Sequence, residues 1–289
     1  DGPLAEYVLR PDDFGLDATR TMVDVPSLLS LVDGARARSL VERLAFGRSA
    51  ADLPESRAAA VALVEDELRA AGYEPQQQLV THPSTGAQAP NVYVDLPGTA
   101  CTDATLVVGA HWDAVAGSPG ADDNATGVAA LLELARALRA NPLPVNVRFV
   151  AFAFEEDGLV GSIAMANELA AQGSDVAGAL SMDMLGLTKP DIDPLTGLPH
   201  TYLAMVADPT SSAMARAFGA AAYTYLPEFP AAAAVIDPAV LGDILRSDHA
   251  PFLAQGYPAM MATDTANFRN PHYHQPTDTP DTLDWAYLT

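Results

Sequence analysis

The sequence predicts an α/β protein with three layers, αβα, in which helices cover both faces of a mostly parallel, mixed central sheet. Two apolar runs, at 106–110 and 145–154, have the length of buried strands, and each is followed by an acidic loop and then by apolar residues at helical spacing. A third run, at 176–184, again places an acidic residue near the end of a strand. Strands that alternate with helices favour parallel pairing, because each helix returns the chain to the other end of the sheet.

Length and composition are those of one large globular unit. The chain has 289 residues, 49% of them apolar, and a mean hydropathy of +0.10, which permits a sizeable core. We expect a single domain over 1–289, with the Pro- and Asp-rich segment 1–26 wrapping the surface. No apolar run approaches the roughly 18 residues that a membrane span needs, so none is expected.

Charge and cysteine content restrict the possible partners. There are 37 acidic and 15 basic residues, and the net charge of -22 opposes contact with phosphate backbones, so nucleic acid is not an expected partner. With Cys101 as its only cysteine the chain forms no internal disulfide, which leaves the compartment undecided. Because the first residue is Asp1 rather than Met, we expect a secreted or periplasmic protein. The oligomeric state cannot be derived from these features.

The region before residue 100 supplies helices first and strands second. Residues 25–46 carry a broken helical pattern, and a clearer helix is expected over 55–71, ending at Gly72. Its apolar residues recur three or four positions apart, which gives it one buried face. Residues 73–80 and 91–96 have the pattern of strands separated by a loop rich in turn-forming residues.

The region after residue 188 is less regular. Residues 189–200 are rich in turn formers, and their acidic residues lack the spacing of an EF-hand calcium loop, so a surface loop or a lid is expected. The alanine-rich run at 230–235 favours no element. His82 and His200 are interpreted as surface residues. The remaining predicted elements are helices over 210–222 and 247–255 and a strand over 257–263.

The loop after the first apolar run is a candidate binding site. It holds His111, Asp113, Asp122 and Asp123 at the carboxyl end of the predicted strand, where ligands bind in open α/β sheets. An imidazole and several carboxylates beside a helix N-terminus suit a divalent cation. The plain alternative is a solvated acidic loop with an incidental histidine.

Five side chains, each just past an apolar strand or in a loop beside one, form a candidate metal site: His111, Asp123, Glu156, Asp183 and His274. Loops from neighbouring parallel strands converge on one rim, so residues far apart in sequence can share a pocket. One carboxylate bridging two cations, with one His and one carboxylate on each, gives a co-catalytic pair about 3.5 to 4 Å apart. Imidazole and carboxylate donors without thiolate favour zinc, with cobalt or manganese able to substitute.

Six motifs resemble, in family order, the two-zinc exopeptidase family of secreted bacterial aminopeptidases, which also contains glutaminyl cyclases and glutamate carboxypeptidases. The resemblance extends from about Leu40 onward and implies the zinc-exopeptidase (phosphorylase/hydrolase-like) fold. The motifs are GAHWD at 109–113, GADDNATG at 120–127, FEEDGLVGS at 154–162, MDMLG at 182–186, SDHAPF at 247–252 and YHQPTDTPDTLD at 273–284.

The resemblance implies a ligand set for two zinc ions: His111 and Asp183 on one, Glu156 and His274 on the other, and Asp123 as the bridge. Asp123 aligns with the bridging position because it stands four residues before Gly127. Asp122 is then expected to act in the loop or behind the ligands.

Four further residues receive roles from the same resemblance. Adjacent residues within a strand point to opposite faces, but at a strand end both Glu155 and Glu156 can turn toward one pocket. Glu155, not bound to metal, is then expected to be the general base. Asp113 is expected to orient His111 by a hydrogen bond, Tyr273 to donate to the developing oxyanion, and Asp248 to support the site without binding metal.

The resulting prediction is a zinc-dependent aminopeptidase that acts on peptides with a free N-terminus. A pocket lined with carboxylates would hold the cationic substrate N-terminus beside the metals. Carboxypeptidase or dipeptidase action remains open, as does glutaminyl cyclase activity, although cyclases resemble one another in a Trp where this chain has Tyr273. A non-catalytic binding ectodomain of the same fold is a third possibility, which the complete set of ligands disfavours.

Overall fold

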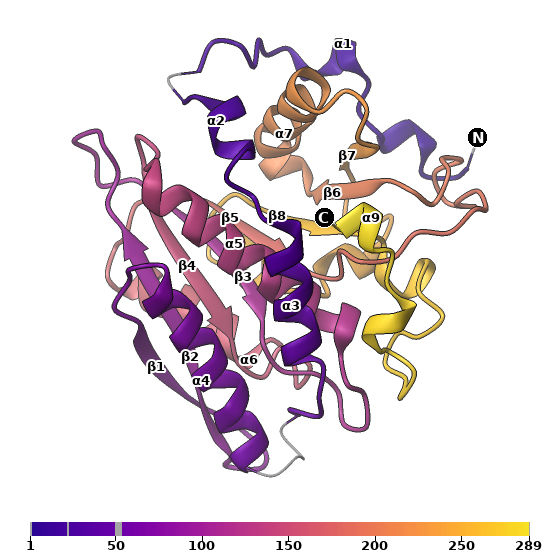
Figure 1. The fold of residues 1–289 in the computed structure, drawn as a ribbon. Helices are drawn as coiled ribbons and strands as arrows, with labels where there is room; N and C mark the ends of the chain where they lie inside the picture. The colour runs from indigo at the N-terminus through magenta and orange to yellow at the C-terminus, as the bar shows by residue number, and fades with distance from the viewer. Residues whose placement is uncertain (1, 22, 50–53, 289) are drawn as a thin grey trace.

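One mixed sheet of eight strands runs through the part of the chain that the structure describes, residues 2–21, 23–49 and 54–288 of a computed structural model (Figure 1). The strand order is β1-β2-β4-β3-β5-β8-β6-β7. The strands are β1 (Gln76–Thr81), β2 (Gln88–Leu96), β3 (Thr105–His111), β4 (Asn146–Phe152), β5 (Val176–Met182), β6 (Leu203–Ala207), β7 (Ala231–Val235) and β8 (Ala259–Thr263).

The centre of the sheet is parallel, and the strand next to it on each side is antiparallel to it. Strands β4, β3, β5 and β8 pair in parallel, whereas β2 is antiparallel to β4 and β6 is antiparallel to β8. The carboxyl ends of the four central strands therefore lie together at one end of the sheet, called the carboxyl edge below. Their buried, nearly continuous apolar sequences agree with coverage on both faces.

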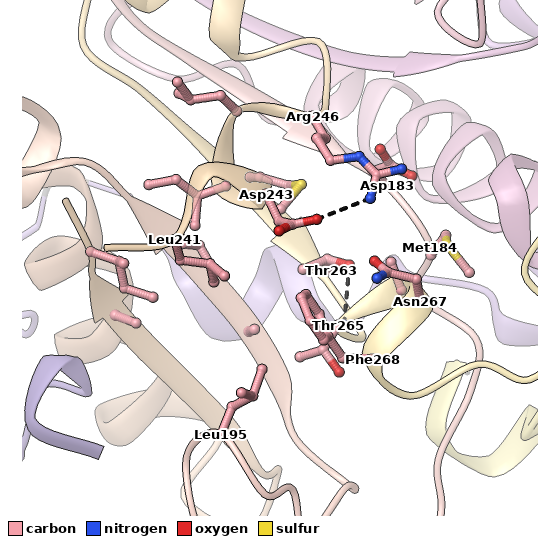
Figure 2. Close-up of a pocket in the computed structure, with 18 of the residues that line it drawn as sticks. Asp183, Met184, Leu195, Leu241, Asp243, Arg246, Thr263, Thr265, Asn267 and Phe268 are labelled. Atoms are coloured by element: carbon pink, nitrogen blue, oxygen red, sulfur yellow. Dashed lines mark hydrogen bonds and ion pairs between the residues drawn. The ribbon is translucent and has the colours of Figure 1, made fainter. Parts of the chain in front are cut away.

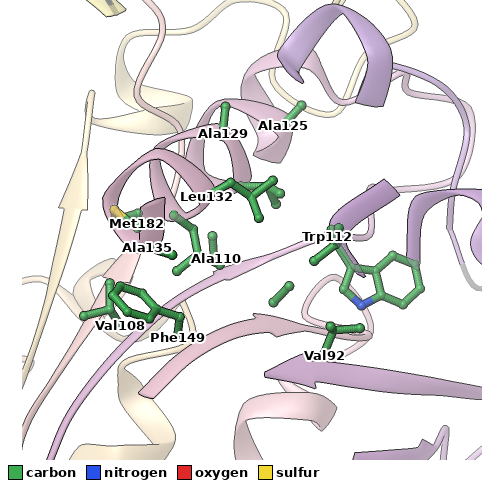
Figure 3. Close-up of a cluster of buried hydrophobic side chains, with 14 of the residues drawn as sticks. Val92, Val108, Ala110, Trp112, Ala125, Ala129, Leu132, Ala135, Phe149 and Met182 are labelled. Carbon is green, nitrogen blue, oxygen red and sulfur yellow. The ribbon is translucent and has the colours of Figure 1, made fainter. Parts of the chain in front are cut away.

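Helices form a layer on each face of the sheet. One layer holds α3 (Gly34–Leu44), α4 (Pro54–Ala70), α5 (Gly127–Ala140) and α7 (Ser212–Tyr225), and the other holds α6 (Val160–Ala171) and α8 (Ala250–Ala254). Figure 3 shows Leu132 and Ala135 of α5 packed near Val108 and Phe149 of the sheet. On the opposite face, Met165 and Phe252 pack with Phe152. This is the predicted three-layer α/β fold.

The N-terminal segment lies against the β7 edge of the sheet. It contains two short helical turns, η1 (Ala5–Tyr7) and α1 (Pro11–Phe14), and an isolated antiparallel bridge joins Val8 to Ala234 of β7. Phe14 packs closely against Gly219 of α7. Within the described residues, no helix combines the length and the hydropathy that crossing a bilayer requires.

Strands β6 and β7 and the environment of two histidines differ from the sequence-based expectation. Each of these strands has alanines and only one β-branched residue, Val206 or Val235, and no aromatic residue, so the usual strand signal is weak and neither was predicted. The interpretation of His82 and His200 as surface residues was wrong. His82 is buried with its ring edge-on to Phe154, and His200 is buried beside Asp191. The predicted helix over 247–255 is limited to α8, so Asp248 precedes it.

Candidate metal centre

The five predicted ligand residues meet at the carboxyl edge of the central strands. His111 is the last residue of β3, and Asp183 directly follows β5. The Nε2 atom of His111 lies 3.4 Å from Oδ1 of Asp123 and 3.6 Å from Oδ1 of Asp183. The Nε2 atom of His274 lies 3.2 Å from Oδ2 of Asp123 and 3.1 Å from Oε2 of Glu156. Each carboxylate oxygen of Asp123 thus faces a different imidazole.

These separations suit donors that share a metal ion. A tetrahedral zinc ion with ligands at about 2.0 to 2.1 Å separates its donor atoms by about 3.4 Å. His111, Asp123 and Glu156 offer ligand atoms that lie within 4.8 Å of one another, and His111, Glu155 and Asp183 do so too. In the described structure Oε1 of Glu156 is buried without a hydrogen-bond partner. An unpaired buried carboxylate oxygen is costly, and a cation would satisfy it.

The turn after β4 explains how two adjacent glutamates reach one pocket. The strand ends at Phe152, and Phe154 adopts a positive φ of 55°, which redirects the chain. The Asp113 carboxylate accepts the backbone N–H of Glu155 at 3.2 Å and that of Glu156 at 3.3 Å. The distance from Asp113 to Nδ1 of His111 is 3.6 Å, longer than a hydrogen bond. Asp113 therefore holds the glutamate turn more closely than it holds His111.

Burial and crowding of like charges perturb the ionisation of the site. Burial raises the pKa of Glu156 to about 7, with a further contribution from Asp123, and burial raises the pKa of Glu155 well above its usual value. Burial alone would lower the pKa of His274, but its contacts with Asp123 and Glu156 outweigh that effect and raise it to about 9. Two divalent cations would relieve the repulsion among these carboxylates.

A network behind the ligands fixes the loop that carries Asp123, formed by η2 (Ala121–Thr126). The Asp278 carboxylate accepts the backbone N–H groups of Asp122 and Asp123 at 2.9 and 3.1 Å. Asp122 in turn accepts the N–H of Gly186 and the side-chain amide of Asn270. At Gly120 φ is +61°, and a Cβ there would lie 2.4 Å from the Asp123 carbonyl oxygen, so only glycine fits.

Arg48 extends this network to the backbone that precedes the loop. Its guanidinium is fully buried and donates to the carbonyl oxygens of Leu44, Phe46, Trp112, Pro119 and Gly120. Burial lowers its pKa to about 10, which still leaves it charged at neutral pH. Arg48 was not among the predicted site residues, because nothing in the sequence indicates that this arginine is buried.

Tyr273 and Arg246 lie together at the mouth of the site. Nη2 of Arg246 donates to the Tyr273 hydroxyl at 3.0 Å, and Nη1 donates to Asp243 at 3.0 Å. The Tyr273 ring stacks on His274, and burial raises its pKa, so the hydroxyl keeps its proton. Figure 2 shows Arg246, Asp243 and Asp183 on the same side of the pocket. Arg246 was not among the predicted site residues.

Asp248 occupies a buried position close to the site. It is 1% exposed and lies beside Ser162, and burial raises its pKa to about 7. It belongs to neither of the two candidate ligand groups found in the described residues. Both of its carboxylate oxygens are buried without a hydrogen-bond partner in the described structure, and its support of the site stays a prediction.

The site thus brings together side chains that could bind a metal ion. The model of peptidase family M28 matches residues 91–289, which include all five candidate ligands. The chain belongs to peptidase family M28. The match begins inside β2 and therefore excludes the N-terminal segment and helices α3 and α4.

Three relatives illustrate the range of known M28 sequences that resemble this chain. YfbL of Escherichia coli K12, described as uncharacterized, is 30% identical over 226 residues, 71% of this chain and 69% of its own. Leupeptin-inactivating enzyme 1 of Streptomyces exfoliatus is 33% identical over 69% of this chain and 41% of its own. Leucine aminopeptidase 1 of Arthroderma otae is 30% identical over 68% of this chain and 54% of its own. The chain thus spans about half the length of the last two.

Solved structures share the fold at low sequence identity. The LapA aminopeptidase of Legionella pneumophila has a TM-score of 0.73 at 19% identity, over 92% of this chain and 70% of its own. The aminopeptidase of Aneurinibacillus sp. strain AM-1 has a TM-score of 0.70 at 18% identity, over 91% and 92%. The glutaminyl cyclase of Porphyromonas gingivalis has a TM-score of 0.63 at 20% identity, over 89% and 94%.

Proposed function

We propose that this M28 protein is a two-zinc aminopeptidase that releases N-terminal residues from peptides. The observation that carries the proposal is the placement of Asp123 between two imidazoles, His111 at 3.4 Å and His274 at 3.2 Å. A carboxylate with one oxygen toward each of two donor groups is the arrangement that a co-catalytic metal pair needs.

His111 and Asp183 would hold one zinc ion, Glu156 and His274 the other, and Asp123 both. When bound, the two ions would supply Lewis acidity, which would polarise the scissile carbonyl and lower the pKa of the attacking water to about 7. A cysteine thiolate could also bind zinc. The chain's only cysteine, Cys101, is exposed and is not one of the five predicted ligands.

Glu155 would act as the general base and then as the general acid. Its carboxylate lines the pocket, lies 3.9 Å from Nε2 of His111 and is buried among other acids. It accepts a proton from the attacking water as the water adds to the peptide carbonyl, and it delivers that proton to the leaving amine. Asp113 positions Glu155 for this role through the backbone N–H bonds described above.

Tyr273 would stabilise the developing oxyanion. Because its hydroxyl accepts a hydrogen bond from Arg246, its own proton is free to donate into the pocket. The guanidinium keeps positive charge beside the hydroxyl, which strengthens it as a donor. Arg246 is therefore a positioning residue for Tyr273.

The choice of aminopeptidase rests on charge and on the relatives. The pocket holds the carboxylates of Asp123, Glu155, Glu156 and Asp183, which attract the cationic N-terminus of a peptide. Leucine aminopeptidases are among the relatives. We also infer that the protein is exported, as its net charge of -22 suits an extracellular surface.

A matched pair of substitutions tests the assignment of base and ligand. In Glu155→Gln the two zinc ions should remain, while cleavage of aminoacyl anilides should fall by about 10²- to 10⁴-fold, because the proton acceptor is lost. In Glu156→Gln the chain should also lose zinc, because a ligand is lost. Metal analysis and steady-state kinetics give both readouts.

Turnover measurements also separate the aminopeptidase proposal from glutaminyl cyclase activity. Unchanged turnover in Glu155→Gln would remove Glu155 as the base. If the wild-type protein instead cyclises Gln-leading peptides and leaves aminoacyl anilides intact, it is a glutaminyl cyclase. Assays with and without a chelator complete the test.

A further inference from the structure

The far part of the pocket is an apolar chamber that occupies a place where a helix would otherwise pack. Helices α6 and α8 cover the β4, β5 and β8 part of this face of the sheet, but next to β6 and β7 lies the far part of a pocket whose whole volume, metal end included, is about 430 Å³. Its floor is made of small residues, Ala204, Ala232 and Ala234, whose short side chains leave the space open. Val206 and Ile236 line it as well.

Residues 2–9, the first part of the N-terminal segment, form one wall of this chamber. Leu4 and Val8 line the cavity, and Leu4 is 7% exposed. The backbone N–H of Leu4 donates to the carbonyl of Leu195 at 2.7 Å, and that of Leu9 donates to the carbonyl of Ala233 at 2.8 Å. The segment thus connects the 187–200 loop to strand β7.

Close contact at Gly2 fixes the segment in this place. A Cβ at Gly2 would lie 2.2 Å from the carbonyl oxygen of Leu195, so the two backbones touch with no room for a side chain. In Figure 2, Leu195 is drawn well away from Asp183, which marks the metal end of the same pocket. The wall formed by the segment and its partner loop therefore lies at the far end from the metal centre.

The chamber is continuous with the reacting groups and is large. The same cavity is lined by Glu155, Asp183 and Tyr273 near the metal centre. The whole pocket, metal end included, measures about 430 Å³. Because a closed apolar cavity of about 150 Å³ already holds a benzene ring, the pocket has room for an aromatic side chain beyond the metal centre.

The far end of the chamber is mostly apolar. Asp193 lies on that wall, and its carboxylate accepts hydrogen bonds from the Tyr202 hydroxyl, the Thr196 hydroxyl and the Leu195 N–H, which hold it within the protein. An apolar ring placed against the remaining lining gains by leaving water.

We propose that the chamber receives the side chain of the substrate's N-terminal residue, favours aromatic side chains over small ones, and is limited in depth by residues 2–9. Leu4 and Val8 are then specificity-determining residues supplied from outside the part of the chain that the M28 model matches. This inference rests on the aminopeptidase function proposed above.

The test compares the alanine, leucine, phenylalanine and tryptophan p-nitroanilides. Wild-type kcat/KM should be highest for an aromatic substrate. Leu4→Trp or Val8→Trp fills the chamber and should lower kcat/KM for the phenylalanine substrate at least tenfold relative to the alanine substrate, which does not reach the wall. Val8→Ala deepens the chamber and should raise the tryptophan-to-leucine ratio.

Glu6→Trp is the matched control, because Glu6 lies on the same segment but is exposed and does not line the chamber. Its substrate ratios should equal those of the wild type. Retained alanine turnover in Leu4→Trp or Val8→Trp shows that the variant is folded. If either folded variant keeps the wild-type substrate ratios, or if the wild type prefers the alanine substrate, the inference is overturned.

Binding of 2-phenylethylamine separates this inference from the proposed function, because the compound carries the amine and the ring but no scissile bond. Calorimetry should detect binding to the wild type and Glu6→Trp and a loss of at least tenfold in affinity in Val8→Trp. If 2-phenylethylamine binds in this pattern but the wild type does not cleave the anilides, the aminopeptidase proposal is refuted and the chamber inference stands. Normal turnover with equal binding by all variants would refute the chamber alone.

Discussion

Asp123 is held through both its side chain and its backbone. Its carboxylate faces the imidazoles of His111 and His274, and its backbone N–H donates to the Asp278 carboxylate. Burial alone would raise its pKa, but His111 and His274 lower it below its ordinary value, so this carboxylate stays ionised. A carboxylate that is both ionised and fixed in direction is ready to bind cations with both oxygens.

Protons and metal ions compete for His274. Its pKa is about 9, so at pH 8 most molecules carry the imidazolium, and zinc binds only the neutral ring. Zinc binding should therefore release about one proton at His274, and zinc affinity should fall as the pH drops below about 9. Calorimetric titrations at pH 8 in two buffers of different ionisation enthalpy measure the release. A heat that is independent of the buffer would contradict this.

Arg48 is expected to matter for stability more than any surface arginine. Arg48→Met keeps the volume but removes the buried guanidinium that donates to five carbonyl oxygens, which should lower the free energy of unfolding by more than about 3 kcal/mol. Arg20→Met is the control: this side chain is 86% exposed, and the change should stay within about 0.5 kcal/mol. Urea unfolding of the metal-free protein compares the two, and equal midpoints would refute the role.

The sequence predicts side chains at strand ends better than it predicts those behind them. His111 is the last residue of one apolar strand and Asp183 directly follows another, and the strand pattern alone places such residues at the binding edge. Asp278 and Arg48 act through backbone groups that only the folded chain brings near them. Arg246 was missed for a similar reason, since its partner Tyr273 is 27 residues away in the sequence.

At the scale of elements, the apolar runs predicted the central strands, whereas strands β6 and β7 escaped prediction. Strands β3, β4 and β5 are apolar because helices cover both of their faces. Strands β6 and β7 are alanine-rich because a cavity, rather than a helix, lies on one of their faces. The short alanine side chains that weakened the strand prediction are thus the ones that leave room for the chamber.

The loop 120–127 depends on the C-terminal tail for its shape. Asp278→Ala leaves two buried N–H groups without an acceptor, and zinc affinity should fall by about 10- to 100-fold, as for other residues that hold metal ligands in place. Asp281→Ala, in the same tail but exposed, should leave affinity unchanged. Competition with a chromophoric chelator measures both, and equal affinities would exclude this role for Asp278.

At the scale of the whole molecule, the fold concentrates charge that the metal-free chain tolerates poorly. The net charge is -22, and four acidic side chains line the metal end of one pocket. A ligand that binds only the folded state stabilises it by about 2.7 kcal/mol at a hundred times its Kd. Metal binding and folding are therefore expected to support each other in this protein.

The zinc content of the folded chain tests the central claim most directly. Metal-free protein is dialysed against buffered zinc, and bound zinc is counted by mass spectrometry in the wild type and in Asp123→Ala. The account predicts two zinc ions per wild-type chain and a loss of zinc in the variant, because Asp123 contacts both groups of donors. One ion or none in the wild type, or two in Asp123→Ala, would contradict it.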